Sequence, residues 1–219
     1  MFTVTKEFTV DYAHRLLLPY ESKCSNIHGH TGKILLSISI PKIFENLGMV
    51  VDFVNLKEFC DEVREIFDHK LILNSEDEML VDFIRHNTDF ALVVLDGMNP
   101  TSENLARFAV QYAVDYFADL LKPIDKWTIG CTFYETPTSS ATYKLTSREF
   151  MKTLNELRKI EENKCQENKE EENKEDKKND EHKRSKCWKR HKIMNKHDND
   201  ENVNVAEEHN IKIQVIRLN

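Results

Sequence analysis

The sequence predicts an α+β domain built around one antiparallel sheet. Segments with alternating apolar residues lie near both ends of residues 1–146, and two segments with helical apolar spacing lie between them. No apolar run approaches the roughly 20 residues that a membrane-spanning helix needs. The expected order is therefore strand, strand, helix, helix, strand, strand, in a protein that does not span a membrane.

Two strands are expected at residues 2–10 and 33–41, where β-branched and aromatic side chains alternate with polar ones and Pro41 ends the second run. A second pair is expected at residues 127–135 and 141–145, with a turn through Pro137 between them. The first pair encloses a loop, residues 12–32, that contains three histidines and a cysteine. Loops of this length inside a compact domain are usually functional.

Two helices are expected between the strand pairs. In residues 54–67 apolar side chains recur every three or four positions, with charged residues opposite. The second helix, residues 101–121, follows Pro100, and Thr101 or Ser102 can cap its first free N–H groups. Residues 90–95 are a short apolar run that is either a brief strand or a buried connection.

The charges divide the chain of 219 residues, whose formal net charge is −7. Residues 1–157 contain 15 Lys and Arg against 23 Asp and Glu, whereas residues 158–219 contain 16 against 15. Between residues 161 and 202, 25 of 42 residues are charged, which is too polar for a packed core. The prediction is a main domain at 1–146, a surface helix at 147–162, a disordered charged segment at 163–202 and a short C-terminal segment at 203–219. In the last segment the alternation from Ile211 to Leu218 indicates a strand.

Composition also excludes several classes of protein. The five cysteines are odd in number and scattered, and the first residues do not read as a secretory signal, so we expect a reducing, cytoplasmic location. The acidic main domain argues against nonspecific binding of duplex nucleic acid, which needs a cationic face.

The long loop contains a set of side chains suited to a metal ion. His28 and His30 point the same way if the backbone there is extended, and strand pairing could bring His14 beside them. Three imidazoles with a free fourth position suit a catalytic zinc ion, although histidines are also common in ordinary surface loops. Cys24 in the same loop is either a small apolar residue or, near a metal or histidine, a thiolate able to act as base or nucleophile.

Carboxylates elsewhere offer further chemistry. The carboxylate of Asp68 can fix the tautomer of His69, although such a pair is also common as a charge cluster at a helix end. Glu135 could accept two parallel N–H bonds from an amidine-like ring edge, or simply be a solvated strand end. Glu103 lies where the dipole of the second helix favours a negative charge.

Six motifs together resemble the 6-pyruvoyltetrahydropterin synthase / 6-carboxytetrahydropterin synthase family. They are A-H-R-L at 13–16, C-x3-H-G-H at 24–30, G-M-V-V-D-F at 48–53, D-H at 68–69, P-T-S-E-N at 100–104 and Y-E-T at 134–136. The resemblance spans residues 2–146 in the order of the family. The three residues between the cysteine and the first histidine resemble the bacterial 6-carboxytetrahydropterin synthases more closely.

The resemblance implies a role for each matching residue. It implies zinc ligands at His14, His28 and His30, a catalytic base at Cys24, a proton-relay pair at Asp68 and His69, a pterin-anchoring carboxylate at Glu135, and support for the pterin ring from Thr101, Ser102 and Glu103. It also implies a tunnelling fold, with a four-stranded antiparallel sheet and two helices (ββααββ). In this fold the sheets close a barrel in the oligomer, a hexamer whose sites lie between subunits.

The implied activity is that of a zinc-dependent lyase. It converts 7,8-dihydroneopterin triphosphate into 6-carboxytetrahydropterin, acetaldehyde and triphosphate, a step towards 7-deazaguanine nucleosides such as queuosine. One alternative is the pyruvoyl-forming enzyme, which eliminates triphosphate without cleaving the side chain. Another is a catalytically silent zinc-binding relative that acts as an interaction protein.

Three departures qualify the resemblance. Gly32 stands where the family often has an aromatic residue that contacts substrate, the stretch from about residue 74 to 97 is longer than usual, and the tail after about residue 147 has no counterpart in the family. Basic residues in or near the loop that could meet a triphosphate are Arg15, Lys23 and Lys33.

Overall fold

The structure is a computed structural model that describes residues 1–160, 163 and 213–216. Residues Met1–Ser147, together with the strand at 213–216, form one compact unit. Residues 147–160 are helical, and all but the first belong to a second unit. Apart from residue 163, the charged segment predicted at 163–202 lies outside the described residues.

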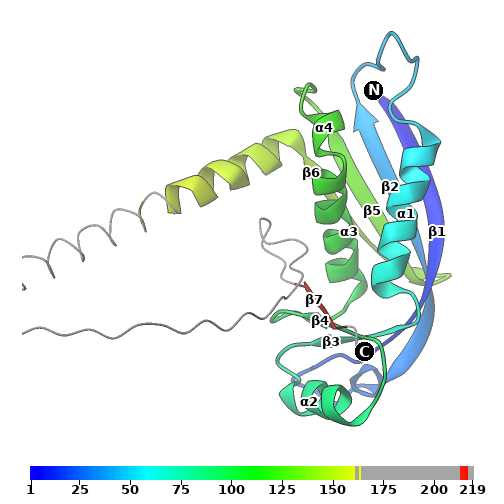
Figure 1. The fold of residues 1–219 in the computed structure, drawn as a ribbon, viewed down its shortest axis with the longest axis vertical. Coiled ribbons are helices and arrows are strands. Elements are labelled where there is room, and N and C mark those ends of the chain that lie inside the picture. The colour runs from blue at the N-terminus through cyan, green and yellow to red at the C-terminus, as the bar shows by residue number, and fades with distance from the viewer. Residues whose placement is uncertain (161–162, 164–212, 217–219) are drawn as a thin grey trace, which may run out of the picture. The chain divides into compact units, whose positions relative to one another are not determined.

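One seven-stranded sheet organises the first unit, in the order β6-β5-β2-β1-β3-β4-β7 (Figure 1). Its strands are β1 (Phe2–His14), β2 (His28–Ile40), β3 (Lys70–Asn74), β4 (Leu92–Leu95), β5 (Thr128–Thr136), β6 (Ser139–Thr146) and β7 (Ile213–Ile216). The four expected strands are present and pair antiparallel. The β7 strand, in the C-terminal segment, pairs antiparallel with β4.

The predicted four-stranded sheet and ββααββ order are wrong, because β3 and β4 add two parallel strands beside β1. All four residues of β4 and the last four of β3 are buried. A strand buried on both faces reads as a short apolar run rather than an alternating one, so periodicity does not mark it.

The β1–β2 ladder is longer than the apolar pattern indicates. It pairs thirteen residues of each strand, from Phe2 opposite Ile40 to His14 opposite His28. The connecting loop therefore shrinks to residues 15–27 and contains a short 3-10 helix, η1 (Lys23–Ser25). The added pairs are mostly polar, but burial still alternates along β1, with Tyr12 and His14 facing inward.

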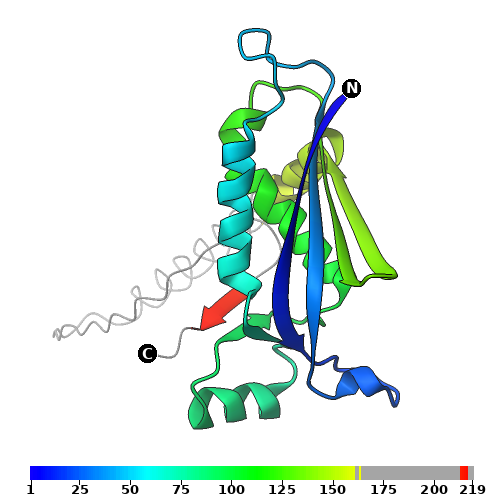
Figure 2. The ribbon, with the colours of Figure 1, turned by 90° about the vertical axis from the view of Figure 1, so that its right-hand side faces the viewer.

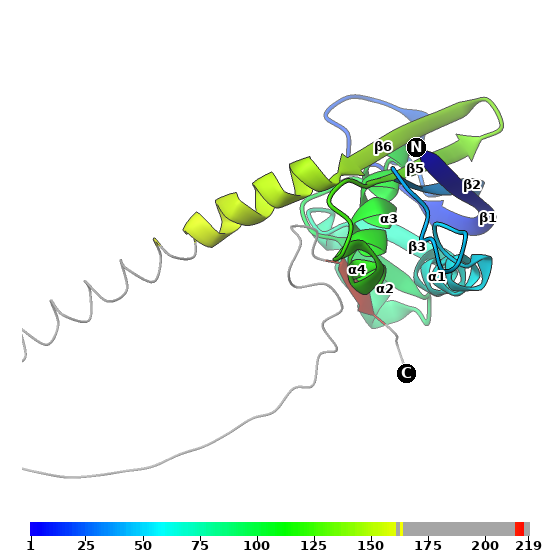
Figure 3. The same cartoon turned by 90° about the horizontal axis from the view of Figure 1, so that it is seen from above.

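The helices are α1 (Phe53–Phe67), α2 (Glu78–Asn87), α3 (Ser102–Tyr116) and α4 (Ala118–Leu121). Figures 2 and 3 show α1 and α3 lying on one face of the sheet. The Asp52 carboxylate caps α1 by accepting the N–H of Val54, and the Thr101 hydroxyl caps α3. The single helix expected over 101–121 divides at Phe117, and α2 was not predicted.

The core fills the space between these helices and the sheet. Its fully buried side chains come mainly from β2, α1 and α3, and include Ile34, Leu36, Ile38, Leu56, Phe59 and Leu105. Cys60 and Cys131 are buried in this core. Within the described part of the chain, no helix combines the length and apolarity that crossing a membrane requires. The packed core fixes the inner face of the sheet, where the site lies.

Candidate metal centre

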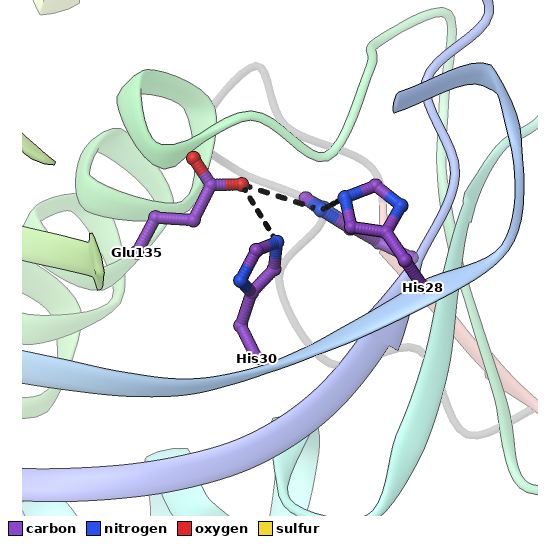
Figure 4. A group of neighbouring side chains, drawn as sticks. His28, His30 and Glu135 are labelled. Atoms are coloured by element: carbon purple, nitrogen blue, oxygen red, sulfur yellow. Dashed lines mark hydrogen bonds and ion pairs between the residues drawn. The ribbon is translucent and has the colours of Figure 1, made fainter. Parts of the chain in front are cut away.

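Three imidazoles and one carboxylate converge at the end of this inner face. His14 ends β1, His28 and His30 begin β2, and Glu135 lies near the end of β5. The strand register places His14 directly opposite His28. One ligand atom from each residue lies within 4.8 Å of every other. Figure 4 shows the side chains of His28, His30 and Glu135 pointing toward one another. These four residues form the only group of this kind found among the described residues.

Backbone carbonyls fix the tautomers of two of these histidines. Nδ1 of His14 lies 2.7 Å from the Pro100 carbonyl oxygen, and Nδ1 of His28 lies 2.8 Å from that of Asn26. A carbonyl oxygen only accepts hydrogen bonds, so both Nδ1 atoms carry the proton. Both Nε2 lone pairs are then directed into the cluster, where these two atoms are 3.1 Å apart. Facing lone pairs repel each other unless a cation or a proton lies between them, so the arrangement suits a metal ion.

The spacing also fits a small divalent ion. Nitrogen and oxygen ligands at about 2.0–2.2 Å in a tetrahedron lie about 3.3–3.6 Å from one another. Oε1 of Glu135 is 3.3 Å from Nε2 of His14 and from Nε2 of His30. Burial lowers the pKa of His14, which keeps this fully buried imidazole neutral and able to coordinate a metal.

Glu135 also contacts the N-terminus of α3. Ser102 is buried, and its hydroxyl donates to Oε2 of Glu135 over 3.3 Å. Thr101 uses its hydroxyl to cap the helix at the N–H of Asn104, and the side chain of Glu103 is exposed. Of the three residues expected to support a pterin ring, the structure therefore brings Ser102 into direct contact with the cluster.

Asp68 and His69 form a separate hydrogen-bonded pair. The Asp68 carboxylate lies 2.9 Å from Nδ1 of His69 and accepts the N–H of Asp11 at 2.7 Å. The His69 N–H donates back to the Asp11 carbonyl at 2.6 Å and holds His69 at a positive φ of 55°. Burial raises the pKa of Asp68, but the Asp11 N–H and His69 outweigh it and leave the pKa below its ordinary value.

An open groove is lined by residues in and next to β1, β2 and β3 that include His30 and His69, but His14, His28 and Glu135 are not among its lining residues. Its walls include Lys70 and two exposed apolar side chains, Ile27 and Phe90. Cys24 lies on η1 and is partly buried, outside the group of potential ligands. Within one chain, therefore, the structure unites the histidines, Glu135 and Ser102, but it does not add the Cys24 thiol to them.

The basic residues near the loop differ in their availability. Nε of Arg15 lies 2.9 Å from a carboxylate oxygen of Asp77, which is only 6% exposed. Lys33 is 3.6 Å from Glu7 and lies over the ring of Tyr134. Arg15 is thus already paired inside the protein.

Several residues that shape the site carry no sequence signal. The carbonyls of Pro100 and Asn26 and the backbone of Asp11 act through main-chain atoms, which any residue could supply. Tyr12 is 4% exposed and packs edge-on against His14, with ring centroids 5.2 Å apart. Burial, and after it the Glu135 carboxylate, raises the pKa of Tyr12 above its ordinary range.

A sheet whose end gathers three imidazoles and a carboxylate defines an α+β protein with a candidate metal centre. Residues 3–146 match the family model described as 6-pyruvoyl tetrahydropterin synthase, and the chain belongs to this family of enzymes. The 6-carboxy-5,6,7,8-tetrahydropterin synthase of Rickettsia conorii is 30% identical over 138 residues, covering 63% of this chain and 96% of that protein. The protein of the same name from Haemophilus influenzae is 31% identical over 151 residues, covering 66% and 99%.

Solved structures show the same fold. A catalytic-residue mutant of Plasmodium vivax 6-pyruvoyltetrahydropterin synthase superimposes with a TM-score of 0.53 at 18% identity, over 66% of this chain and 97% of that one. The Plasmodium falciparum enzyme of that name gives 0.51 at 19% identity, over 66% and 97%. At this level of identity the likeness concerns the fold alone.

Proposed function

We propose that this protein is a zinc-dependent 6-carboxytetrahydropterin synthase. It would convert 7,8-dihydroneopterin triphosphate, with consumption of water, into 6-carboxytetrahydropterin, acetaldehyde and triphosphate for 7-deazaguanine (queuosine) synthesis. The observation that carries the proposal is the cluster of His14, His28, His30 and Glu135 in a chain of this family. The names of the two bacterial relatives support the carboxy-forming reaction.

The three histidines are the proposed zinc ligands. Their Nε2 atoms face one another, and two of the rings are held from behind by backbone carbonyls. A zinc ion bound there supplies Lewis acidity that polarises and acidifies substrate hydroxyl groups. The donor set fits this ion, because neutral imidazoles with a fourth position left for substrate are typical of catalytic zinc sites.

Oε1 of Glu135 lies among the possible metal ligands, but Glu135 is proposed to bind the substrate, whose hydroxyl groups would take the fourth position on the ion. Its carboxylate would accept two parallel N–H bonds from the amidine edge of the pterin ring. The hydroxyl of Ser102 already holds one of its oxygens, and the backbone of Thr101 and Glu103 continues the surface at the start of α3.

Cys24 is the proposed base, which removes a proton from the substrate side chain, and Asp68 with His69 returns one. Burial raises the pKa of Cys60 to about 11 and that of Cys131 to about 12, which leaves Cys24 as the accessible thiol among the described cysteines. As the resemblance to the family implies, the proposal also includes a hexamer with sites between subunits, in a reducing, cytoplasmic setting.

Product analysis tests the reaction. Purified protein is incubated with 7,8-dihydroneopterin triphosphate, with and without a chelator, and the products are identified by mass spectrometry. We expect acetaldehyde and the 6-carboxy product, and their loss when zinc is removed. A pyruvoyl product without acetaldehyde would assign the other family activity, and intact substrate would identify a catalytically silent relative.

Metal content tests the assignment of ligands. His28→Ala should lose zinc, whereas His86→Ala, at an exposed histidine on α2, should keep it. Glu135→Gln should keep zinc but lose turnover, and loss of zinc in this variant would make Glu135 a ligand instead. Cys24→Ala should keep zinc and lose turnover, so full turnover would refute its role as the base.

A further inference from the structure

Tyr12 reaches across a neighbouring strand towards the metal centre. It lies on β1, and Phe133 lies on β5, with β2 between them. Their rings nevertheless meet, with centroids 5.7 Å apart at 77°. They meet above Gly32 of β2, where an added Cβ would lie 3.0 Å from carbons of both rings. A Cβ at this position would require these rings to move by a few tenths of an ångström, and a large side chain would compete with them for the same space.

Two other rings fill the space that an aromatic side chain at position 32 would occupy in this chain. The space above Gly32 is filled from β1 by Tyr12 and from β5 by Phe133. The ring at this place therefore comes from a different strand. Because the residue on β1 is a tyrosine, it also brings a hydroxyl group into the interior.

This hydroxyl is a buried donor that makes no hydrogen bond within the described part of the chain. Buried hydroxyl groups without a partner are uncommon and unfavourable, which suggests that the group serves a bound state. The ring that carries it packs against His14 and His30, with centroids 5.2 and 5.8 Å away. Oε1 of Glu135 lies 3.3 Å from Nε2 of each of these two histidines, so the carboxylate is in the same neighbourhood as the Tyr12 ring.

The Glu135 carboxylate has an acceptor site that the Tyr12 hydroxyl could use. A carboxylate offers about four lone-pair sites. The proposed pterin edge takes two of them with its parallel N–H groups, and the Ser102 hydroxyl takes one on Oε2. One site remains for a further donor on the side of Oε1.

We propose that Tyr12 is a positioning residue for substrate binding, whose hydroxyl donates to Glu135 when a pterin occupies the site. Tyr12 and Ser102 then hold the carboxylate from two sides and orient it towards the ring edge. The inference rests on the proposed function, because it needs a pterin at Glu135. The inference adds Tyr12 to the site, and it gives Gly32 the role of leaving space for the Tyr12 ring.

Tyr12→Phe tests the hydroxyl, because it retains the ring and its packing. Binding of neopterin, a fluorescent pterin without triphosphate, is measured for the wild type, Tyr12→Phe, Glu135→Gln and the double variant. We expect Tyr12→Phe to weaken binding about tenfold, as for a lost hydrogen bond to a charged group. Zinc content and thermal stability should stay close to wild type, and Tyr116→Phe should leave binding unchanged.

The double variant shows whether Tyr12 acts through Glu135. If it does, adding Tyr12→Phe to Glu135→Gln should weaken binding little further. In turnover, Tyr12→Phe should raise KM much more than it lowers kcat. Unchanged neopterin binding in Tyr12→Phe would overturn the inference, as would full additivity in the double variant. Neopterin binding without turnover would refute the proposed reaction alone, and absence of neopterin binding in the wild type would refute both.

A reciprocal exchange separates packing from hydrogen bonding. Gly32→Phe alone should lower stability and zinc content, because the new ring would overlap those of Tyr12 and Phe133. Tyr12→Ala together with Gly32→Phe should restore both, because one ring then again occupies the space. The restored protein lacks the hydroxyl and should still bind neopterin about tenfold more weakly than wild type. Wild-type affinity in this variant would assign Tyr12 a packing role only.

Discussion

Replacing Arg15 with alanine should lower the stability of the folded protein and leave its affinity for a triphosphate substrate unchanged. Asp77 begins α2, and its side chain is only 6% exposed. Nε of Arg15 lies 2.9 Å away, although its N–H is not aligned for a hydrogen bond. The guanidinium thus provides the positive charge that accompanies a buried carboxylate.

The size of the effect follows from the burial of the pair. Removing one partner of a fully buried ion pair destabilises a protein by about 3–5 kcal/mol, because the other charge is left uncompensated. Arg15 is 27% exposed, so water screens part of the interaction, and we expect about 2–3 kcal/mol for Arg15→Ala. In a protein of this size, that lowers the melting temperature by about 5–10 °C.

Chemical and thermal denaturation of Arg15→Ala, Asp77→Asn and the double variant would measure the coupling. The double variant should be less destabilised than the sum of the two single variants. Lys57→Ala, at an exposed pair with Asp61 on α1, should change stability by less than about 0.5 kcal/mol. If Arg15→Ala melted like the wild type but raised KM for the triphosphate substrate, Arg15 would be a substrate ligand and the reasoning would be wrong.

Three other predictions concern acid stability, zinc and the sheet edge. The pKa of Asp68 is lower in the folded state than in the unfolded state, so this carboxylate stabilises the protein above about pH 4. The stabilisation is lost as the pH falls through the folded-state pKa. In urea denaturation, Asp68→Asn should therefore lose less stability than the wild type over that range. Zinc at about 100 times its dissociation constant should stabilise the wild type by about 2.7 kcal/mol in thermal denaturation, and His14→Ala should not respond. Deleting residues 204–219 removes β7, so amide hydrogen exchange in β4 should accelerate; unchanged exchange would mean that the β4–β7 pairing does not protect this edge.

The antiparallel half of the fold and the helices facing it could be predicted because one face of each element is buried. That burial leaves a period of two in β2 and of three or four in α1, which the sequence displays directly. The β3 strand was missed because both of its faces are buried, so its apolar run lacks a period; for the same reason the run that contains β4 was left open between a brief strand and a buried connection. Helix α2 was also not predicted; it lies within residues 74–97, the stretch expected to be longer than is usual in the family.

The candidate ligands could be named from the sequence because spacing alone aligns them. His28 and His30 are two apart on an extended strand, and His14 ends the strand expected to pair with it. Their tautomers could not be predicted, because they depend on the carbonyls of Pro100 and Asn26.

By itself, the sequence identified the candidate chemical groups for a site: three imidazoles, a thiol, an adjacent Asp and His, and a carboxylate. Only the tertiary structure decided which of these groups meet. It joined Glu135 from β5 to the histidines of β1 and β2, left Cys24 outside that group, and paired Arg15 with Asp77. It also brought Tyr12 across β2 above Gly32. The physical reason is that periodicity specifies the side of an element on which a residue lies, whereas contacts between distant strands depend on sheet order and register.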